Sequence, residues 1–409
     1  MLSLVCTFLA LRRVAPPWRA LTLTGACALA WLGFRHYTFW TRPEPLQLLC
    51  VSAGLLASVR ARGVMGGVAL GVCAGLLWNL KITGPLYTLP LLVILWHGAG
   101  ARATLAATAV AVGVFVWPFA ALSNVSFSAY LTWVRLSSQN GLLLSMLRQN
   151  MEWAAFFLLP MLVSYYGARP DDRPHGASWR GLVAALVVGL AGVCVAASKP
   201  GAGVYHLLPF LPIVVWATAR ALARETRDAQ DSAPTASASL SHDRGARVLA
   251  LSCAITACLI AIVQQTSFLT LTHARHRSLE TEDVRAFAAA HPGATVAMAY
   301  SGDDELTFAR PELVFASGSY LIDAPAVQEH QLSGVAVPQA TIDAVRDCRI
   351  DIWLAPRGAA PFEGLNRYPA MARTPLFSEA FRAAFHASYG RDGATRYFDI
   401  WTCRTSRSR

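Results

Sequence analysis

Long apolar runs follow one another through the first 269 residues of this 409-residue chain, and they constrain its fold more than any other feature. Brief polar or arginine-bearing connections separate them. The runs cover residues 2–11, 20–36, 46–59, 63–80, 84–97, 103–121, 152–167, 181–198, 204–222 and 248–269. An α-helix needs ~20 predominantly apolar residues to cross a bilayer. This succession predicts a polytopic α-helical membrane protein with about 10 spans.

Composition and charge favour the same fold class. Hydrophobic residues make up 55% of the chain and charged residues 14%, with a mean hydropathy of +0.41. Soluble proteins carry about 25% charged residues. Residues 1–269 hold 20 Lys and Arg against 8 Asp and Glu, while residues 270–409 hold 15 against 16. Because the excess positive charge lies in the apolar part, it predicts contact with a membrane and no nucleic-acid partner.

The arginines predict an orientation, because every second connection is basic. These basic connections hold 14 positive charges, and the remaining connections hold 6. By the positive-inside rule the basic set is cytoplasmic, which places residues 122–150 and the tail after residue 270 on the outer side. Apolar and polar residues interleave in 122–150, which indicates one or two amphipathic helices on that surface. An Ala- and Arg-rich, Lys-poor composition is typical of a GC-rich bacterium, so we expect a multi-pass protein of the bacterial inner membrane.

After residue 270 the pattern becomes that of a small α/β domain. Helices are predicted at 279–290 and 338–348, and strands at 294–300, 350–354 and 395–402. We therefore expect two domains, a membrane domain at residues 1–269 and an extracytoplasmic α/β domain at residues 270–409.

A polar island at residues 40–46 interrupts the apolar pattern. Arg42 and Glu44 are charged where the bilayer interface is expected, and such groups usually pair, snorkel or serve a site. Pro43 and Pro45 restrict the backbone, so we expect a rigid loop that ends where a helix starts near Leu46. The alternative is an interfacial anchor formed with the aromatic residues before it.

Lysine occurs at only two positions, Lys81 and Lys199, against 33 arginines, and both fall at predicted outer ends of spans. A compact ammonium charge suits a phosphate group, so with Arg42 the two lysines would suit an anionic lipid headgroup. Tyr205 and His206 follow the second lysine, and His206 could hydrogen-bond a phosphate or a sugar. Snorkelling lysines and an interfacial polar cap remain the alternatives.

Three segments, at residues 40–46, 75–90 and 205–212, together resemble the GT-C membrane glycosyltransferases. The similarity is closest to the branch with protein mannosyltransferases and the bacterial aminoarabinose transferase that acts on lipid A, and it covers about residues 1–270. Residues 310–315 and 397–401 resemble an outer domain that some members carry. The resemblance implies sugar transfer from a polyprenyl-phosphate donor to a lipid or glycan acceptor on the outer face.

In that chemistry an acidic residue deprotonates the acceptor hydroxyl or holds a divalent metal, and cations bind the phosphate as its charge grows. The resemblance implies that Glu44 is the catalytic carboxylate. It assigns donor binding to Arg42, Lys81, Lys199, Tyr205 and His206. No metal-ligand set is assigned and the cofactor stays unknown, because the acidic run 303–305 is more typical of a solvated turn.

One departure from the family pattern bears on activity. The family's first outer loop carries its principal acidic motif, whereas no acidic residue precedes Glu44 here. We therefore expect either that further residues precede this chain or that it has lost activity. Two other classes stay open: a transporter or lipid flippase with the same charges in a vestibule, and a non-catalytic scaffold.

Cysteine usage divides along the same boundary. Seven of the nine cysteines lie in apolar runs, where a thiol behaves as a small hydrophobe. Cys348 and Cys403 both border predicted strands of the outer domain, where oxidation is permitted. They form a disulfide if those strands are neighbours, and are two unrelated buried thiols otherwise.

Overall fold

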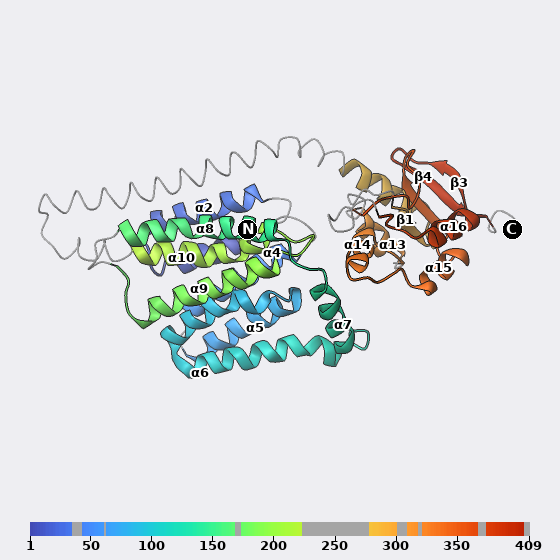
Figure 1. Cartoon of the computed structure of the whole chain (residues 1–409). Coiled ribbons are helices and arrows are strands. Elements are labelled where there is room, and N and C mark those ends of the chain that lie inside the picture. Colours follow the sequence, from blue (N-terminus) through green and yellow to red (C-terminus); the bar gives the residue numbers. More distant parts are fainter. Residues whose placement is uncertain are drawn as a thin grey trace, which may run out of the picture. The chain divides into compact units, whose positions relative to one another are not determined.

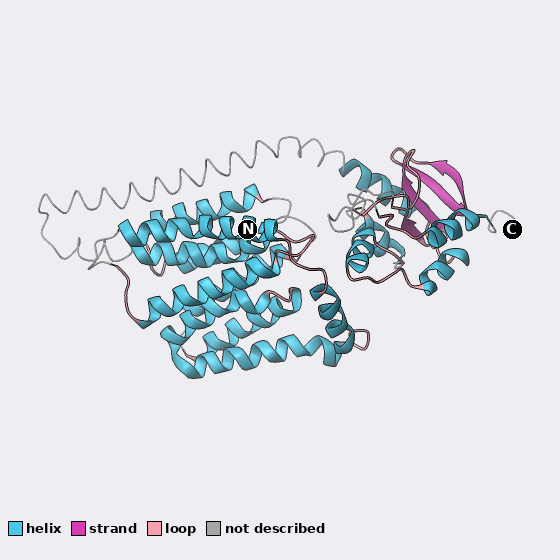
Figure 2. Cartoon of the chain, in the orientation of Figure 1, coloured by secondary structure: helices cyan, strands magenta, loops and turns pink. Residues whose placement is uncertain are grey.

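A computed structural model describes residues 1–34, 43–60, 63–167, 173–222, 278–300, 309–317, 321–366 and 374–404. The chain divides into two compact units. The first comprises residues 1–131 and 141–265, and the second residues 132–140 and 266–409. The predicted boundary at 269/270 falls outside the described residues and stays a prediction. Helices fill the described part of the first unit, and the sheet belongs to the second (Figure 2).

Helices that lie side by side make up the first unit (Figure 1). They are α1 (Leu2–Leu11), α2 (Pro17–Gly33), α4 (Glu44–Arg60), α5 (Val64–Leu80), α6 (Gly84–Ala121), α8 (Leu144–Gly167), α9 (Ala177–Ala196), the 3-10 helix η2 (Val204–Phe210) and α10 (Leu211–Leu222). The amphipathic helix α7 (Phe127–Ser138) follows α6.

Three described segments are long and apolar enough to cross a membrane: Gly84–Ala121, Ala177–Ala196 and Val204–Leu222. Two shorter apolar helices, α1 and α5, accompany them. The structure is thus mostly helical and has candidate membrane spans, as the sequence predicted. The run 248–269 lies outside the described residues, so the count of about 10 spans stays a prediction.

Several helix boundaries differ from the predicted ones, and α2 and α9 begin at Pro17 and Ala177 instead of 20 and 181. The runs 84–97 and 103–121 stay two separate helices, both covered by the label α6, and they meet at Gly100, whose φ of 81° and ψ of −179° are not helical. Only glycine adopts that backbone conformation without strain, so the predicted connection survives as a kink. Helix α8 begins at Leu144 instead of 152, and it absorbs the second half of the segment predicted to be amphipathic. Helix α4 begins at Glu44 instead of Leu46, because proline is tolerated in a first helical turn.

Close packing of α5 on α6 rests on three glycines one turn apart, Gly67, Gly71 and Gly75. A Cβ atom at each would overlap the backbone oxygen of Ala103, Ala107 or Ala111 in α6. Small residues at this spacing let helix backbones approach closely where lipid gives no hydrophobic driving force for association.

The second unit holds a four-stranded mixed sheet in the order β1-β2-β4-β3. Its strands are β1 (Val296–Met298), β2 (Ile352–Pro356), β3 (Tyr389–Ala394) and β4 (Phe398–Cys403). Strand β1 pairs parallel to β2, and the pairs β2–β4 and β3–β4 are antiparallel. Residues 278–290 are helical, and the other helices are α13 (Arg310–Ser317), α14 (Ala324–Leu332), α15 (Gln339–Arg346) and α16 (Glu379–Ser388).

The predicted elements of this unit are present, with shifted ends. Strand β4 starts at Phe398 instead of 395, because residues 395–397 form the turn from β3. Sequence reasoning missed β3, whose glycines and charged residues are poor strand formers. It pairs as the edge strand, with a register shift between Arg391 and Gly393. An edge strand is where such residues and irregularities are tolerated.

Aromatic side chains form the core of the second unit. Trp353 from β2 is fully buried, and its ring lies edge-on to the rings of Phe362, Phe385 and Tyr389. Edge-to-face pairs of this kind add stability beyond the area that they bury. The buried hydroxyl of Tyr389 donates a hydrogen bond to Ile350 O at 2.7 Å. Burial of this hydroxyl raises its pKa above the ordinary value, so it stays a neutral donor at physiological pH.

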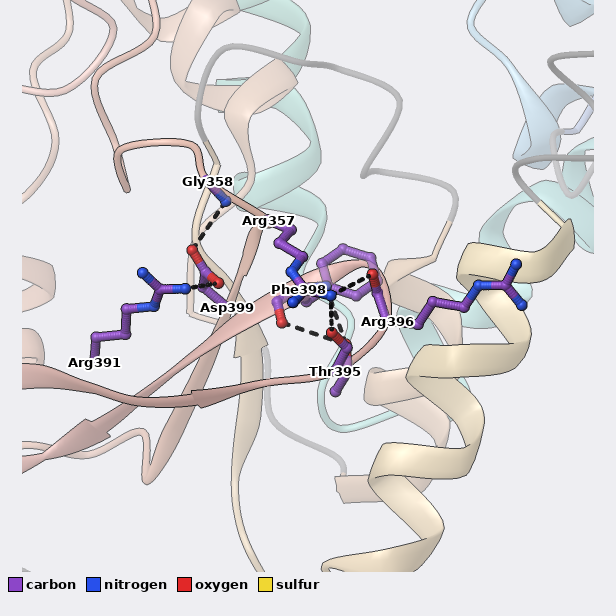
Figure 3. Close-up of polar contacts among 7 residues, drawn as sticks. All are labelled: Arg357, Gly358, Arg391, Thr395, Arg396, Phe398 and Asp399. Atoms are coloured by element: carbon purple, nitrogen blue, oxygen red, sulfur yellow. Dashed lines mark hydrogen bonds and ion pairs between the residues drawn. The ribbon is translucent and has the colours of Figure 1, made fainter.

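A polar cluster closes the β3–β4 hairpin (Figure 3). The buried carboxylate of Asp399 accepts hydrogen bonds from Gly358 N at 3.0 Å and from Arg391 Nη2 at 2.6 Å. Thr395 closes the turn, because its backbone N donates to Phe398 O and its hydroxyl accepts from Phe398 N. Asp399 therefore ties the loop after β2 to both strands of the hairpin, and its charge is matched by an arginine as burial requires.

Cys348 and Cys403 form a disulfide, with Cα atoms 5.9 Å apart. Cys403 ends β4, which lies next to β2, and Cys348 precedes β2 by a few residues. The bridge therefore depends on the strand adjacency that sequence alone left open. The other described cysteines, Cys6, Cys27, Cys50, Cys73 and Cys194, are free.

Replacing Cys348 and Cys403 together by serine should destabilise the second unit by about 4 kcal/mol, the chain-entropy value for a closed loop of this length. Thermal unfolding of the purified chain, with and without reductant, measures the loss. Replacing Cys6 and Cys50 by alanine is the matched control. An unchanged melting temperature in the serine variant, or alkylation of both thiols without prior reduction, would contradict the bridge.

Candidate functional site

Glu44 begins helix α4, and its side chain is 2% exposed. Pro43 precedes the helix and accepts the first intrahelical hydrogen bond, from Gln47 N at 2.9 Å. A carboxylate in the first turn interacts favourably with the positive end of the helix dipole. Two prolines and a helix start thus hold an acidic group inside the apolar bundle.

Lys81 comes directly after the last residue of helix α5, in extended conformation. Its Nζ lies 2.6 Å from Glu44 Oε1, and its side chain is 19% exposed. A tight turn follows, in which Gly84 N donates to Lys81 O at 2.8 Å before α6 begins. A Cβ at Gly84 would overlap Leu77 O, so this turn requires glycine. The ion pair therefore joins the start of α4 to the α5–α6 turn.

Helix η2 contributes the aromatic side of the site. Lys81 Nζ lies 5.2 Å from the centre of the Tyr205 ring, within the range of a cation–π contact. The rings of Tyr205 and His206 pack with centroids 4.5 Å apart. Tyr87 of α6 is fully buried and donates a hydrogen bond to His206 O at 2.7 Å, while Thr83 donates to the Tyr87 hydroxyl at 3.3 Å. These contacts join η2 to α6 beside the ion pair.

The buried carboxylate of Glu44 uses only one of its oxygens within the described structure. Glu44 Oε1 accepts from Lys81, whereas Oε2 is buried and has no hydrogen-bond partner among the described residues. The same holds for Nε2 of Gln47, which is 1% exposed. Residues three apart share a helix face, so a buried acceptor and a buried donor lie one turn apart. Such a pair matches a hydroxyl group, which both donates and accepts.

The predicted site residues are brought together in part. Glu44, Lys81, Tyr205 and His206 gather at one end of the bundle. Lys199 lies between α9 and η2, is half-buried, and forms no ion pair among the described residues. Arg42 lies outside the described residues, as does the acidic run 303–305.

Two residues were missed by sequence reasoning, Gln47 and Tyr87. The i, i+3 spacing from Glu44 could have identified Gln47, because it puts both on one helix face. Nothing in the sequence separates Tyr87 from the other tyrosines. Within the described ranges, no group of three or more His, Cys, Asp or Glu side chains is arranged to hold a metal ion.

Replacing Lys81 by methionine should lower the free energy of unfolding by roughly 3–5 kcal/mol, because a buried carboxylate would lose its partner. The charge-swapped variant Glu44→Lys with Lys81→Glu should recover part of that loss. Thermal unfolding of the purified full-length chain measures both. Arg148→Gln is the matched control, because it breaks an exposed pair with Glu152 (82% and 63% exposed) and should change little. Equal melting temperatures for Lys81→Met and Arg148→Gln would show that the buried pair has no structural role.

The described geometry is thus a buried carboxylate–ammonium pair at helix ends, with a donor and an acceptor available beside it and two aromatic rings on η2. This arrangement can hold a hydroxyl-bearing or anionic group in a largely desolvated place. No family model, no curated protein and no solved structure matches the chain.

Proposed function

We propose that the chain is a membrane glycosyltransferase that moves a sugar from a polyprenyl-phosphate donor to a hydroxyl acceptor on the outer face. The observation that carries this proposal is the buried Glu44 carboxylate, which has one oxygen held by Lys81 and the other without a hydrogen-bond partner among the described residues, one helical turn from Gln47. A general base must reach the hydroxyl that it deprotonates within hydrogen-bond distance. Glu44 Oε2 and Gln47 Nε2 together offer that contact.

In the proposed reaction the acceptor hydroxyl gives its proton to Glu44 Oε2. The acceptor oxygen then forms a bond with the anomeric carbon, and the bond from that carbon to the donor phosphate oxygen breaks. The phosphate leaves with the bonding electron pair as polyprenyl phosphate, and cations stabilise the charge that it gains. Atoms and charge balance without a further reactant.

Lys81 would serve as the cation nearest to this step. Its ammonium group is already paired with Glu44 at 2.6 Å, so a donor phosphate would compete with the carboxylate for it. Phosphate binding would therefore weaken the ion pair. Arg42 and Lys199 are proposed to complete the phosphate site, with Tyr205 and His206 bordering it.

The proposed orientation places the second unit outside the cytoplasm. The Cys348–Cys403 disulfide supports this side, because structural disulfides persist in oxidising compartments. The alternation of basic connections supports about 10 spans with those connections facing the cytoplasm of a bacterium. The site around Glu44 would then lie at the outer end of the bundle.

Glu44→Gln should lower sugar transfer by ~10²-fold or more, because the amide cannot accept the proton. The assay supplies purified protein in lipid vesicles with labelled polyprenyl-phosphate sugars and a membrane extract as the source of acceptor, and it measures the release of polyprenyl phosphate. Because this product is released whichever acceptor reacts, the acceptor does not have to be identified. Glu152→Gln, a change at an exposed acid of the same unit, is the matched control and should keep full activity.

Wild-type turnover in folded Glu44→Gln would overturn the catalytic role. The charge-swapped variant distinguishes catalysis from a second hypothesis, in which the chain is a non-catalytic scaffold and the ion pair is only structural. A structural pair tolerates the swap in both stability and activity, whereas a catalytic carboxylate at position 44 cannot be replaced by lysine. Absence of turnover by the wild-type chain with every donor offered would favour the scaffold or the transporter.

Single cysteines test the orientation in a background whose free thiols are replaced by alanine. A cysteine at Ser123 or Ala360 should react with an impermeant maleimide on intact cells. One at Ala101 should react only after permeabilisation, because it adjoins the basic connection at Arg102. All three positions are exposed in the structure. Labelling at Ala101 from outside would invert the proposed topology.

A further inference from the structure

A groove of about 440 Å³ lies between the end of α8 and the start of α9. It belongs to the opposite end of α9 from η2 and the Glu44–Lys81 pair, because α9 runs from the groove at Trp179 to the connection that leads into η2. It therefore forms no part of the site described above. Its lining residues are Met161, Leu162, Tyr165, Tyr166, Trp179, Arg180, Val183, Ala184 and Val187.

One end of the groove is aromatic and basic. The rings of Tyr165 and Trp179 stack with centroids 5.6 Å apart and an interplanar angle of 12°. The Arg173 guanidinium lies 5.6 Å from the centres of both the Tyr165 and Tyr166 rings. Arg180 lines the groove and is exposed, and its guanidinium forms no hydrogen bond or ion pair with a described residue. Two guanidinium groups and three aromatic rings therefore mark the mouth of the groove.

The other end of the groove is apolar and opens on the outside of the bundle. Val187 is 51% exposed and Leu162 is 39% exposed, and Val188 on the same helix is 58% exposed. None of the groove's lining residues is acidic. The connection before Gly176 also carries Arg169, Asp171 and Asp172, which lie outside the described residues.

We propose that this groove binds an anionic phospholipid, with one acyl chain along the apolar trough and the phosphate at Arg180 and Arg173. The inference rests on the proposed membrane embedding, not on the proposed transfer reaction. Arginine binds phosphate through a planar fork of donors, and aromatic rings occupy the level of the headgroups. The positive-inside assignment puts this mouth at the cytoplasmic surface, where anionic lipids attract basic residues.

Charge complementarity and position together favour a lipid over a soluble ligand. An apolar trough on the lipid-facing side of a bundle is already in contact with acyl chains, so binding there costs little dehydration. The arginines select among lipids, because a zwitterionic headgroup offsets the phosphate charge and an anionic headgroup does not. Binding at this end would hold α8 and α9 together across their loop.

Native mass spectrometry of the full chain in detergent tests the proposal, with phosphatidylglycerol and phosphatidylcholine as probes. We expect tighter binding of phosphatidylglycerol. Arg180→Gln should weaken it about fivefold, the effect of one basic residue at an anionic surface. Arg102→Gln, an exposed arginine away from the groove, is the matched charge control and should bind as the wild type does. Glycerol phosphate alone should not compete, because it lacks the acyl chain.

A second pair of variants tests the trough. Val187→Trp should block acyl-chain binding, while Val188→Trp, on the same helix but outside the groove, should not. Equal losses of phosphatidylglycerol binding in Arg180→Gln and Arg102→Gln would show that only the general surface charge matters. That result would overturn the proposed site. Unchanged lipid binding in Val187→Trp would also overturn it. If that variant instead converted dimers to monomers, the groove would belong to a second copy of the chain.

Discussion

The ion pair between Glu44 and Lys81 joins helices that meet at one end of the bundle, and much of the proposed chemistry depends on it. Burying a carboxylate that is 2% exposed costs several kcal/mol of desolvation, which a paired ammonium group offsets. The pair therefore fixes the start of α4 against the turn between α5 and α6. That turn exists because Lys81 leaves the helix in extended conformation and Gly84 admits a close approach to Leu77.

The same ion pair leaves polar atoms of the site without a hydrogen-bond partner. A carboxylate accepts through two oxygens, and Lys81 satisfies one of them. Glu44 Oε2 and Gln47 Nε2 are left buried without a partner among the described residues. Leaving such groups unsatisfied costs free energy of the order of 1–3 kcal/mol each, so a ligand group that pairs with both atoms would be stabilised there. This is the physical basis for proposing a hydroxyl ligand there.

The two units differ in how they are stabilised and in how their buried polar groups are satisfied. In the first, the backbone satisfies itself within helices, and small residues such as Gly71 let α5 and α6 approach closely. In the second, aromatic packing around Trp353 and a disulfide stabilise a small mixed sheet. The buried Asp399 is matched by Arg391 and a backbone N–H, the counterpart in this unit of the Glu44–Lys81 pair. In both units a buried carboxylate, paired with a basic side chain, joins separate segments of the fold.

Much of the architecture could be predicted from the sequence, because its causes are local. Apolar runs predict helices through periodicity and length, and prolines and glycines mark their ends, as Pro45 and Gly84 do. The change in composition near residue 270 predicted a small α/β domain. The strands predicted at 350–354 and 395–402 overlap β2 and β4. Edge strand β3 escaped prediction, because its stability comes from pairing with β4 and not from its own residues.

The site was foreseeable as a set of residue types and not as a geometry. The charges of Glu44 and Lys81 stood out because ionisable groups are rare in apolar surroundings, yet their pairing depends on how α4 and α5 pack. The Cys348–Cys403 bridge likewise depends on strand adjacency that no spacing encodes. Only the tertiary structure identified Gln47, Tyr87 and the groove at Arg180 as candidate functional features, because their importance depends on which residues surround them. The sequence by itself determined that the first part of the chain is helical, with segments apolar enough to cross a membrane, and it identified the candidate charges. Tertiary structure decided which groups meet, because contacts between distant segments are set by packing rather than by local propensity.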